Sequence, residues 1–427
     1  MTQVDTRYPG PETIHQHTLP NGITLLVYEN FASQAVVIEG LVRAGALGES
    51  RATAGLASLT AASLMRGATH RTFEQIYEEL EGVGADLGFS SGFHTTGFAA
   101  NSLVEDVDLV LDVMADALRQ PAFPEKPVAQ LRGQMLTGLQ LRADDTQRMA
   151  RLTFNELLYD GHPFGRSASG YVDSVAALTP DDLAEFHGRF YGPAGMIVTV
   201  VGGMAAADVV EKVTAVLGDW HTPQQEILPP MPDAPRPTKT IRAQADMPGK
   251  SQADIVLGLP GPRRRAPDYL DVSLMNTILG VFGMMGRIGQ NVREAQGLAY
   301  YAYSNLRGGL GPSPWIAAAG VAPPNVEKTI ASIRQEIQRI QDEPVTAEEL
   351  ADCQAYRTGS LPVSLETNSG LAGAITDMAL YELGLDYLQR FPDEIRSITP
   401  ARIQAAAQKY LSADHLAIAV AGPDGQG

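Results

Sequence analysis

The chain contains the stretch Ser174-Val-Ala-Ala-Leu-Thr-Pro180, which leads through an amphipathic segment into Ile197-Val-Thr-Val-Val-Gly-Gly203. Near its other end it contains Glu394-Ile-Arg-Ser-Ile-Thr-Pro400 and Ala417-Ile-Ala-Val-Ala-Gly-Pro423, in the same register and without a gap. In each copy Thr-Pro predicts a helix start, with Thr as the N-cap and Pro at the first helical position. The apolar run that follows predicts a strand. This repeat decides the fold, because it indicates two copies of one structural unit.

Other elements of the sequence agree with two similar halves. Residues 107–118 and residues 326–340 place apolar side chains at steps of three and four, which predicts one amphipathic helix in each half. A shorter amphipathic helix is predicted at 73–80. Strands are predicted at 23–28, 35–42, 86–99, 254–259 and 298–303. Because the strands alternate irregularly with helices, the sequence predicts an α+β fold in each half, with helices on one face of a mainly antiparallel sheet.

The boundary between the halves is rich in proline. Residues 221–237 contain six prolines, which exclude a helix or a central strand and favour an extended, semi-rigid spacer. The chain of 427 residues also exceeds the roughly 250 to 300 at which a single core stops growing. We therefore expect an N-terminal half-domain at 1–220, a linker at 221–240 and a C-terminal half-domain at 241–427.

Composition narrows the class of protein. A hydrophobic fraction of 44% is enough for packed cores, and a formal net charge of -17 argues against nucleic acid or an anionic membrane as a partner. The single cysteine, Cys353, excludes an intrachain disulfide and is interpreted as an incidental thiol. Residues 1–11 lack the pattern of a secretory signal, and no apolar run reaches about 18 residues, so we expect a cytoplasmic protein.

Two stretches resemble signatures of the pitrilysin/insulinase-like (M16) peptidases. The first, Met275-Asn-Thr-Ile-Leu-Gly280 with Val292-Arg-Glu-Ala-Gln-Gly-Leu-Ala-Tyr300, is similar to the L-N-x-x-L-G and V-R-E-x-x-G-L-A-Y of the family's C-terminal domain. The second, Gly55-Leu-Ala-Ser-Leu-Thr-Ala-Ala-Ser-Leu-Met-Arg-Gly67, has the frame of its zinc helix, G-x-A-H-x-x-E-H. The resemblance covers roughly residues 14 to 423 and implies two homologous half-domains of the LuxS/MPP-like type that form a clamshell.

The zinc ligands of that family are missing from this chain. A zinc helix needs two histidines one turn apart and a carboxylate to take the proton from the bound water. The histidine positions correspond to Ser58 and Ala62, and the glutamate position to Ala61. The distal glutamate ligand corresponds to Gly138, on a helix expected at 130–142. We therefore predict no metal and no cofactor in this chain.

Arg293 and Tyr300 are the candidate catalytic residues. In the family this Arg and Tyr reach the substrate, so the resemblance implies the same role here. Arg293 is predicted in the last turn of a helix that ends at Gly297, and can offer a planar fork of donors to a peptide carbonyl or carboxylate. Tyr300 is predicted on the next strand, where its phenol can donate to a carbonyl oxygen that becomes an oxyanion.

The combination resembles the noncatalytic member of a two-subunit M16B peptidase. It implies a partner, a zinc-bearing homologue that forms a heterodimer with this chain, and an unfolded peptide substrate bound in an extended form at a sheet edge. In that case the chain is inactive alone and zinc is held by the partner. Two alternatives stay open: a nonenzymatic structural subunit, like the core proteins of the bc1 complex, and a homodimeric peptide-binding protein.

Overall fold

The structure is a computed structural model that describes residues 8–423; Met1–Arg7, part of the stretch read for a secretory signal, lies outside the described residues. The chain forms two compact units that are discontinuous in sequence. Unit 1 contains the residues up to Leu139, Ser167–Pro229 and Pro362–Arg390, and unit 2 contains Gln140–Arg166, Pro230–Leu361 and the residues from Phe391 onward. Each half of the sequence therefore gives one segment to the other unit. Residues 221–237 form no helix or strand, as the prolines predicted.

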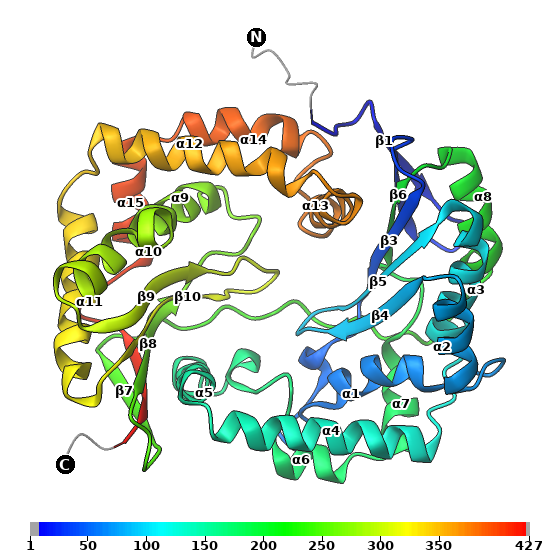
Figure 1. Ribbon diagram of the computed structural model, residues 1–427, viewed down its shortest axis with the longest axis horizontal. Helices are drawn as coiled ribbons and strands as arrows, with labels where there is room; N and C mark the ends of the chain where they lie inside the picture. Colours follow the sequence, from blue (N-terminus) through cyan, green and yellow to red (C-terminus); the bar gives the residue numbers. More distant parts are fainter. Residues whose placement is uncertain (1–7, 424–427) are drawn as a thin grey trace. The chain divides into compact units, whose positions relative to one another are not determined.

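Unit 1 is built on a six-stranded sheet (Figure 1). All neighbouring strands are antiparallel except β2 and β6. The strands, in their order across the sheet, are β1 (Ile14–Thr18), β2 (Thr24–Glu29), β6 (Ile197–Gly202), β3 (Ala35–Val42), β5 (Thr96–Leu103) and β4 (Asp86–Ser91). The sequence predicted 86–99 as one strand, which is wrong. The chain turns between β4 and β5, where the Gly92 N–H donates a hydrogen bond to the Thr95 carbonyl at 2.8 Å, and the two strands form a hairpin.

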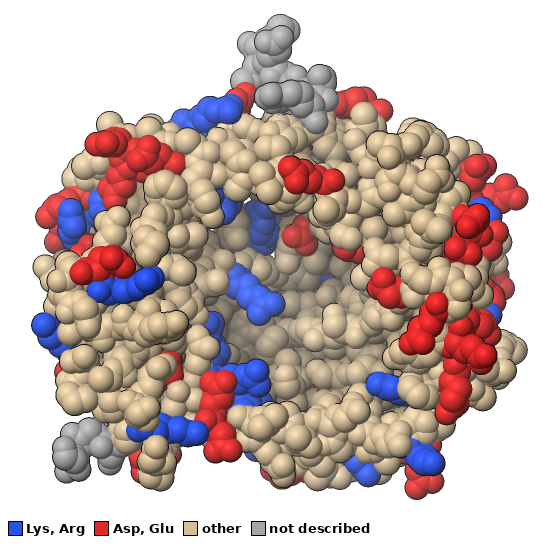
Figure 2. Space-filling view, in the orientation of Figure 1, with Lys and Arg blue, Asp and Glu red and all other residues tan. Residues whose placement is uncertain are grey.

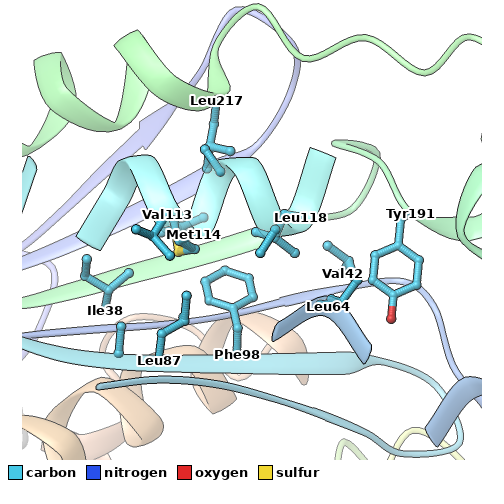
Figure 3. Close-up of a cluster of buried hydrophobic side chains, with 14 of the residues drawn as sticks. Ile38, Val42, Leu64, Leu87, Phe98, Val113, Met114, Leu118, Tyr191 and Leu217 are labelled. Atoms are coloured by element: carbon cyan, nitrogen blue, oxygen red, sulfur yellow. The ribbon is translucent and has the colours of Figure 1, made fainter. Parts of the chain in front are cut away.

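The main core of unit 1 lies between this sheet and the helices on one of its faces (Figure 3). Ile38, Leu87 and Phe98 from the strands meet Met114 and Leu118 from α3, the helix predicted at 107–118. The first half of the sequence gives unit 1 these helices: α1 (Leu56–Ser63), α2 (Phe73–Gly82), α3 (Val107–Arg119), most of α4 (Glu125–Ala143), α6 (Val172–Ala177), α7 (Pro180–Phe190) and α8 (Ala206–Leu217).

Unit 2 repeats this plan with a five-stranded sheet. The strands across it are β7 (Ile241–Asp246), β11 (Ala417–Gly422), β8 (Ala253–Pro260), β10 (Pro314–Val321) and β9 (Ala299–Leu306), and β7 and β11 are its parallel pair. Its helices include α9 (Tyr269–Gly280), α10 (Phe282–Gly289), the π-helix Gln290–Ala295, α11 (Val326–Asp342), most of α12 (Ala347–Ser364), the end of α14 (Tyr387–Arg396) and α15 (Pro400–Tyr410). Short 3-10 turns lie at Ala46–Gly48, Leu64–Arg66, Val104–Asp106, Pro163–Gly165 and Pro323–Asn325.

The two Thr-Pro motifs begin equivalent helices, as the repeat predicted. The Thr179 side chain accepts a hydrogen bond from the backbone N–H of Asp182 at the start of α7, and the Thr399 side chain accepts one from Arg402 at the start of α15. Each helix is followed by a fully buried strand, β6 or β11. The internal duplication is thus present in the structure as two copies of a capped helix and a central strand.

The expectation of helices on one face only is wrong for both sheets. Helix α13 (Asn368–Leu380) packs on the face of β3 and β6 that lies away from the main core, and its Thr376 hydroxyl donates to that of Thr199 at 2.7 Å. Helix α5 (Thr146–Leu158) packs in the same way on β7, β8 and β11. The physical reason lies in the strands: β6, β8 and β11 are mostly apolar, with such side chains on both faces, so both faces must be covered.

Candidate functional site

Helix α1 carries the positions where the resemblance implies a zinc site. The Ser58 hydroxyl donates to the carbonyl of Ala168 at 2.9 Å, so the chain segment around Ala168 lies against this side of the helix. Ala61 is completely buried and Ala62 is partly buried against the core. Gly138, at the distal ligand position, is exposed on α4. These four residues contribute packing and one hydrogen bond, and none offers a metal ligand.

A carboxylate holds the start of α1. Glu49 is 7% exposed, and its two oxygens accept hydrogen bonds from the backbone N–H groups of Gly55 at 3.1 Å and Ala57 at 2.6 Å. Both N–H groups belong to the first turn, where a helix leaves its donors without internal partners and favours negative charge. Gly55 precedes the helix with a φ of 98°, a conformation that glycine adopts at low cost. The helix is therefore well anchored although its zinc motif is gone.

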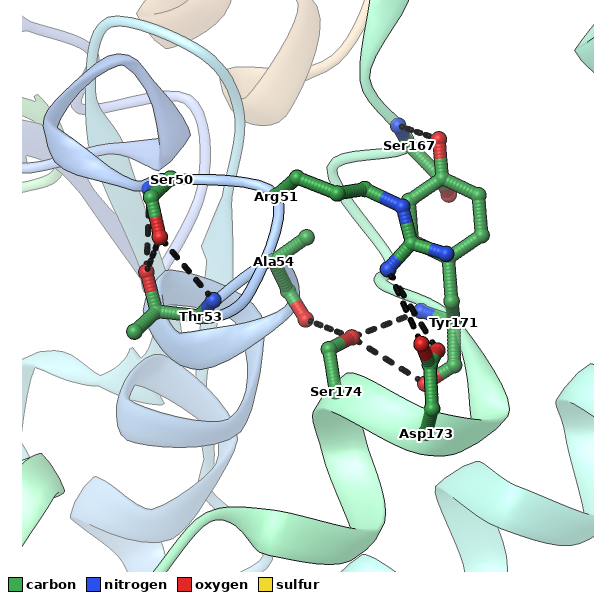
Figure 4. A network of polar contacts seen from close by, with 8 residues as sticks. All are labelled: Ser50, Arg51, Thr53, Ala54, Ser167, Tyr171, Asp173 and Ser174. Atoms are coloured by element: carbon green, nitrogen blue, oxygen red, sulfur yellow. Dashed lines mark hydrogen bonds and ion pairs between the residues drawn. The ribbon is translucent and has the colours of Figure 1, made fainter.

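The loop that leads into α1 is tied to the loop before α6 (Figure 4). The Arg51 guanidinium stacks on the ring of Tyr171, 3.5 Å from its centroid, and pairs with Asp173 at 3.3 Å. The Ser174 hydroxyl donates to the carbonyl of Ala54 at 2.7 Å. A backbone hydrogen bond from Ser174 and the Arg51 guanidinium lower the pKa of Asp173. Across residues 8–423, no group of three or more His, Cys, Asp or Glu side chains is placed to hold a metal ion.

Arg293 lies on a π-helix in unit 2, close to the helical turn that the sequence predicted. The π-helix ends at Ala295, two residues before Gly297, which has a φ of 60° and donates its N–H to the Arg293 carbonyl at 3.1 Å. The Arg293 side chain is 37% exposed, and among residues 8–423 its one ion pair is with its neighbour Glu294, at 3.4 Å. An exposed pair of this kind contributes little stability, so the guanidinium can exchange it for another acceptor.

A polar network maintains the π-helix. The Asn291 amide donates to the buried carboxylate of Glu336 on α11 at 2.6 Å. The Gln296 amide donates both to Asn291 at 2.6 Å and to the Ser332 hydroxyl at 2.9 Å. Single-turn π-helices are rare and are often found at functional sites. These four residues were not identified from the sequence, because Asn, Gln and Ser are ordinary helix-surface residues until their partners are known.

Tyr300 lies on β9, the edge strand of the sheet in unit 2. Its side chain is 85% exposed. The pairing of β9 with β10 explains this exposure: Ala299 faces Val321 and Tyr301 faces Gly320, so Tyr300 is the extra residue of a β-bulge. Strand β9 also contacts the π-helix, so the structure places the elements that carry Arg293 and Tyr300 against each other.

A break in the helical backbone of α10, at residues 283–286, lies just before the π-helix and was not predicted from the sequence. Gly283, Met284, Met285 and Gly286 all have positive φ values, which is unusual for the two methionines. Met284 and Met285 are 58% and 41% exposed. Gly286 is required for the close packing of this segment, because a Cβ there would lie 2.5 Å from the Ile278 carbonyl oxygen.

Two other features do not form a site. Cys353 is buried, and burial with the nearby carboxylates of Glu349 and Asp352 raises the pKa of its thiol to about 12, so it stays protonated at neutral pH. A cavity of about 510 Å³ lies between α2, α3 and α8, in the region where Figure 2 shows acidic side chains gathered. Its central cation, Arg71, already pairs with Glu79 at 2.8 Å and Asp112 at 2.6 Å.

None of the helices within residues 8–423 is by itself long and apolar enough to cross a membrane. Helix α9 and the helical stretch 282–295 reach the required length and composition only as a pair, which is bent by 85°.

Comparison with known proteins agrees with the signatures in both halves. Residues 25–170 match the family model described as insulinase (peptidase family M16), and residues 177–356 match the one described as the peptidase M16 inactive domain. An uncharacterized zinc protease of Streptomyces coelicolor is 27% identical over 409 residues, which is 94% of this chain and 88% of the relative.

Solved structures share the whole fold. The peptidase M16 inactive domain from Pseudomonas fluorescens has a TM-score of 0.88 and 26% identity, and covers 96% of this chain and 98% of its own. A protease from Helicobacter pylori has a TM-score of 0.90 at 18% identity, over 97% of this chain and all of its own, and shows the fold alone. Both sequence signatures and both family matches lead to one conclusion: the chain belongs to the M16 family of peptidases.

Proposed function

We propose that this chain is the noncatalytic subunit of a two-chain M16 peptidase and contributes Arg293 and Tyr300 to a site whose zinc is held by a homologous partner. One observation carries the proposal. The family's substrate-contacting Arg and Tyr are retained on a π-helix and a β-bulge, with the Tyr300 side chain 85% exposed, while Ser58, Ala61 and Ala62 replace the zinc ligands.

Each retained side chain has a defined role in this proposal. The phenol of Tyr300 donates a hydrogen bond to the carbonyl oxygen of the scissile peptide as that oxygen gains negative charge. The guanidinium of Arg293 offers parallel N–H donors to a second carbonyl or a carboxylate and so fixes the register of the peptide. In the partner, zinc would polarise the carbonyl and supply an activated water.

The proposed substrate is an unfolded peptide in an extended conformation. Strand β9, which carries Tyr300, is an edge strand of the sheet in unit 2, with backbone groups that do not pair within the sheet. A peptide that adds to such an edge gains main-chain hydrogen bonds without regard to its sequence. Broad specificity is therefore expected.

A mixing experiment tests the division of labour. The purified chain is assayed for bound zinc and for cleavage of an unstructured peptide, alone and with an M16 homologue that carries H-x-x-E-H. We expect neither zinc nor cleavage from the chain alone, and cleavage that increases with the amount of chain added to a fixed amount of homologue. Zinc-dependent cleavage by the chain alone would contradict the proposal.

The absence of zinc ligands in α1 also fits a second function, that of a nonenzymatic subunit or a homodimeric peptide-binding protein. In that case the mixture would cleave no faster than the homologue alone, although the chain could still bind peptide. Titration calorimetry with the same peptide separates these outcomes.

A further inference from the structure

Three residues on neighbouring strands of unit 2 form one row across the sheet. Tyr301 on β9 faces Gly320 on β10, and Gly320 faces Asp254 on β8. Residues that pair directly across strands share a face of the sheet. The Tyr301 hydroxyl donates a hydrogen bond to Asp254, so its ring passes over the glycine between them. Gly320 is required for this: a Cβ there would lie 2.5 Å from the Tyr301 ring.

Asp254 is the centre of this arrangement. It is 1% exposed, and no Lys or Arg among the described residues pairs with it. Its carboxylate instead accepts from the Thr146 hydroxyl at 2.5 Å and the Gln252 amide at 3.1 Å, in addition to Tyr301. A buried charge that depends on neutral donors is costly if one of them is lost. Burial and the bond to Asp254 raise the pKa of Tyr301, so its hydroxyl remains a donor.

The row determines where the bulge in β9 falls. Because Tyr301 is fixed opposite Gly320 while Ala299 pairs with Val321, the one unpaired residue between them must be Tyr300. If Tyr301 were free, the extra residue could move along the edge strand, and each move by one residue would turn side chains to the other face. Thr146, the first residue of α5, adds a bond from outside the sheet that resists such a shift.

We propose that Tyr301 and Asp254 are positioning residues that hold the β-bulge in place and thereby direct the Tyr300 phenol toward the substrate. The inference rests on the proposed function of Tyr300 for its catalytic consequence. Its structural part, that the Tyr301–Asp254 bond fixes the environment of Tyr300, stands on the register, the hydrogen bonds and the glycine between the two residues.

The chain offers a matched control in Tyr303. It lies on the same face of β9 as Tyr301, with ring centroids 5.7 Å apart, but Asp254 accepts no hydrogen bond from it. Tyr301→Phe and Tyr303→Phe each remove one phenolic oxygen from neighbouring positions. Only the first removes a donor to the buried carboxylate.

The structural part is tested on the isolated chain, with 3-fluorotyrosine at position 300 and its ¹⁹F resonance as the readout. We expect Tyr301→Phe to shift or split the resonance and Tyr303→Phe to leave it as in the parent chain. An unchanged resonance in Tyr301→Phe overturns the proposal, whatever the activity of the mixture.

The catalytic part is tested by a double-mutant cycle in the mixture with the zinc-bearing homologue. We expect Tyr301→Phe to lower kcat on the order of 10- to 100-fold, with little change in KM, as for a displaced catalytic group. In the Tyr300→Phe background the same change should lower kcat no further. An equal loss in both backgrounds overturns the positioning role, whereas a silent Tyr300→Phe refutes the proposed function of Tyr300 and leaves the ¹⁹F result to decide the structural part.

Discussion

At the scale of single residues, the positions expected for a zinc site and those expected for substrate contact differ in how far their side chains are buried. Ala61 is completely buried and Ser58 is bonded to a backbone carbonyl, so these side chains have become part of the packing of α1. Tyr300 is 85% exposed although tyrosine is a residue that usually gains from burial. Packing therefore does not explain the side chain of Tyr300, which the bulge in the edge strand holds in solvent. The proposed contact with substrate would explain it.

A histidine in the core of unit 1 makes stability dependent on pH. His187 is partly buried and stacks on the ring of Tyr191, with centroids 4.6 Å apart, and one ring nitrogen bonds to the Leu118 carbonyl at 2.9 Å. Burial lowers the pKa of His187 to about 4 from its ordinary value of 6.5. Between these values the unfolded chain binds the proton and the folded chain does not, so stability falls as the pH decreases from 6.5 to about 4.

We expect this loss to reach about 3 kcal/mol from His187 alone, at 1.36 kcal/mol for each pH unit. Urea unfolding across that pH range measures it. The matched variant is His187→Gln, whose amide can still donate to Leu118 but does not titrate in this range. The variant should lose less stability on acidification than the parent chain. Identical pH dependence in both would show that His187 is not buried in its neutral form.

The residues of the site could be predicted only where a local motif carries them. Arg293 and Tyr300 follow from the spacing of a sequence signature, and Gly297 from the need for a left-handed residue at a helix end. Asp254 and Gly320 could not be predicted, because their role depends on a strand register that brings residues from β8, β9 and β10 into one row. Sequence periodicity indicates which side chains share one face of a strand, but it does not indicate which strand lies beside it.

At the scale of elements, the helices α5 and α13 are the part of the fold that sequence patterns missed. Their apolar faces predict burial, but not against which sheet. Helix α13 buries Leu371, Ile375 and Thr376 in unit 1. In the sequence, however, α13 lies in the second half, most of which forms unit 2. The capped helices α7 and α15 were predictable because Thr-Pro acts within one turn.

This exchange of helices makes a specific prediction for the separated halves. Residues 1–220 alone lack α13, so the apolar face of β6 would be exposed at a cost of about 1.5–3 kcal/mol for each large side chain. We expect this fragment to aggregate. Fusion of residues 362–390 to it through a flexible linker, with residues 140–166 of unit 2 also replaced by a linker, should restore a soluble, cooperatively unfolding protein. Size-exclusion chromatography and thermal unfolding distinguish the two, and a stable, monomeric 1–220 fragment would contradict the assigned role of α13.

At the scale of the whole molecule, the chain is a duplicated M16 protein in which the two copies have diverged in opposite directions. The first copy has Ser58, Ala61 and Ala62 where the family resemblance implies zinc-site residues, and the second has Arg293 and Tyr300, the pair proposed to contact the substrate. For hydrolysis, another chain must supply the zinc ligands; otherwise the protein acts without hydrolysis. The proposed pairing with a zinc-bearing homologue is the first of these two cases.

The most direct test is the kcat for peptide cleavage by the mixture of this chain with a zinc-bearing homologue, measured with the parent chain and with Tyr300→Phe. If the phenol stabilises the developing oxyanion, kcat should fall by about 10²–10³-fold. The zinc content of the homologue and the amount of complex should stay the same. An unchanged kcat with Tyr300→Phe would contradict the claim that this chain completes the active site of its partner.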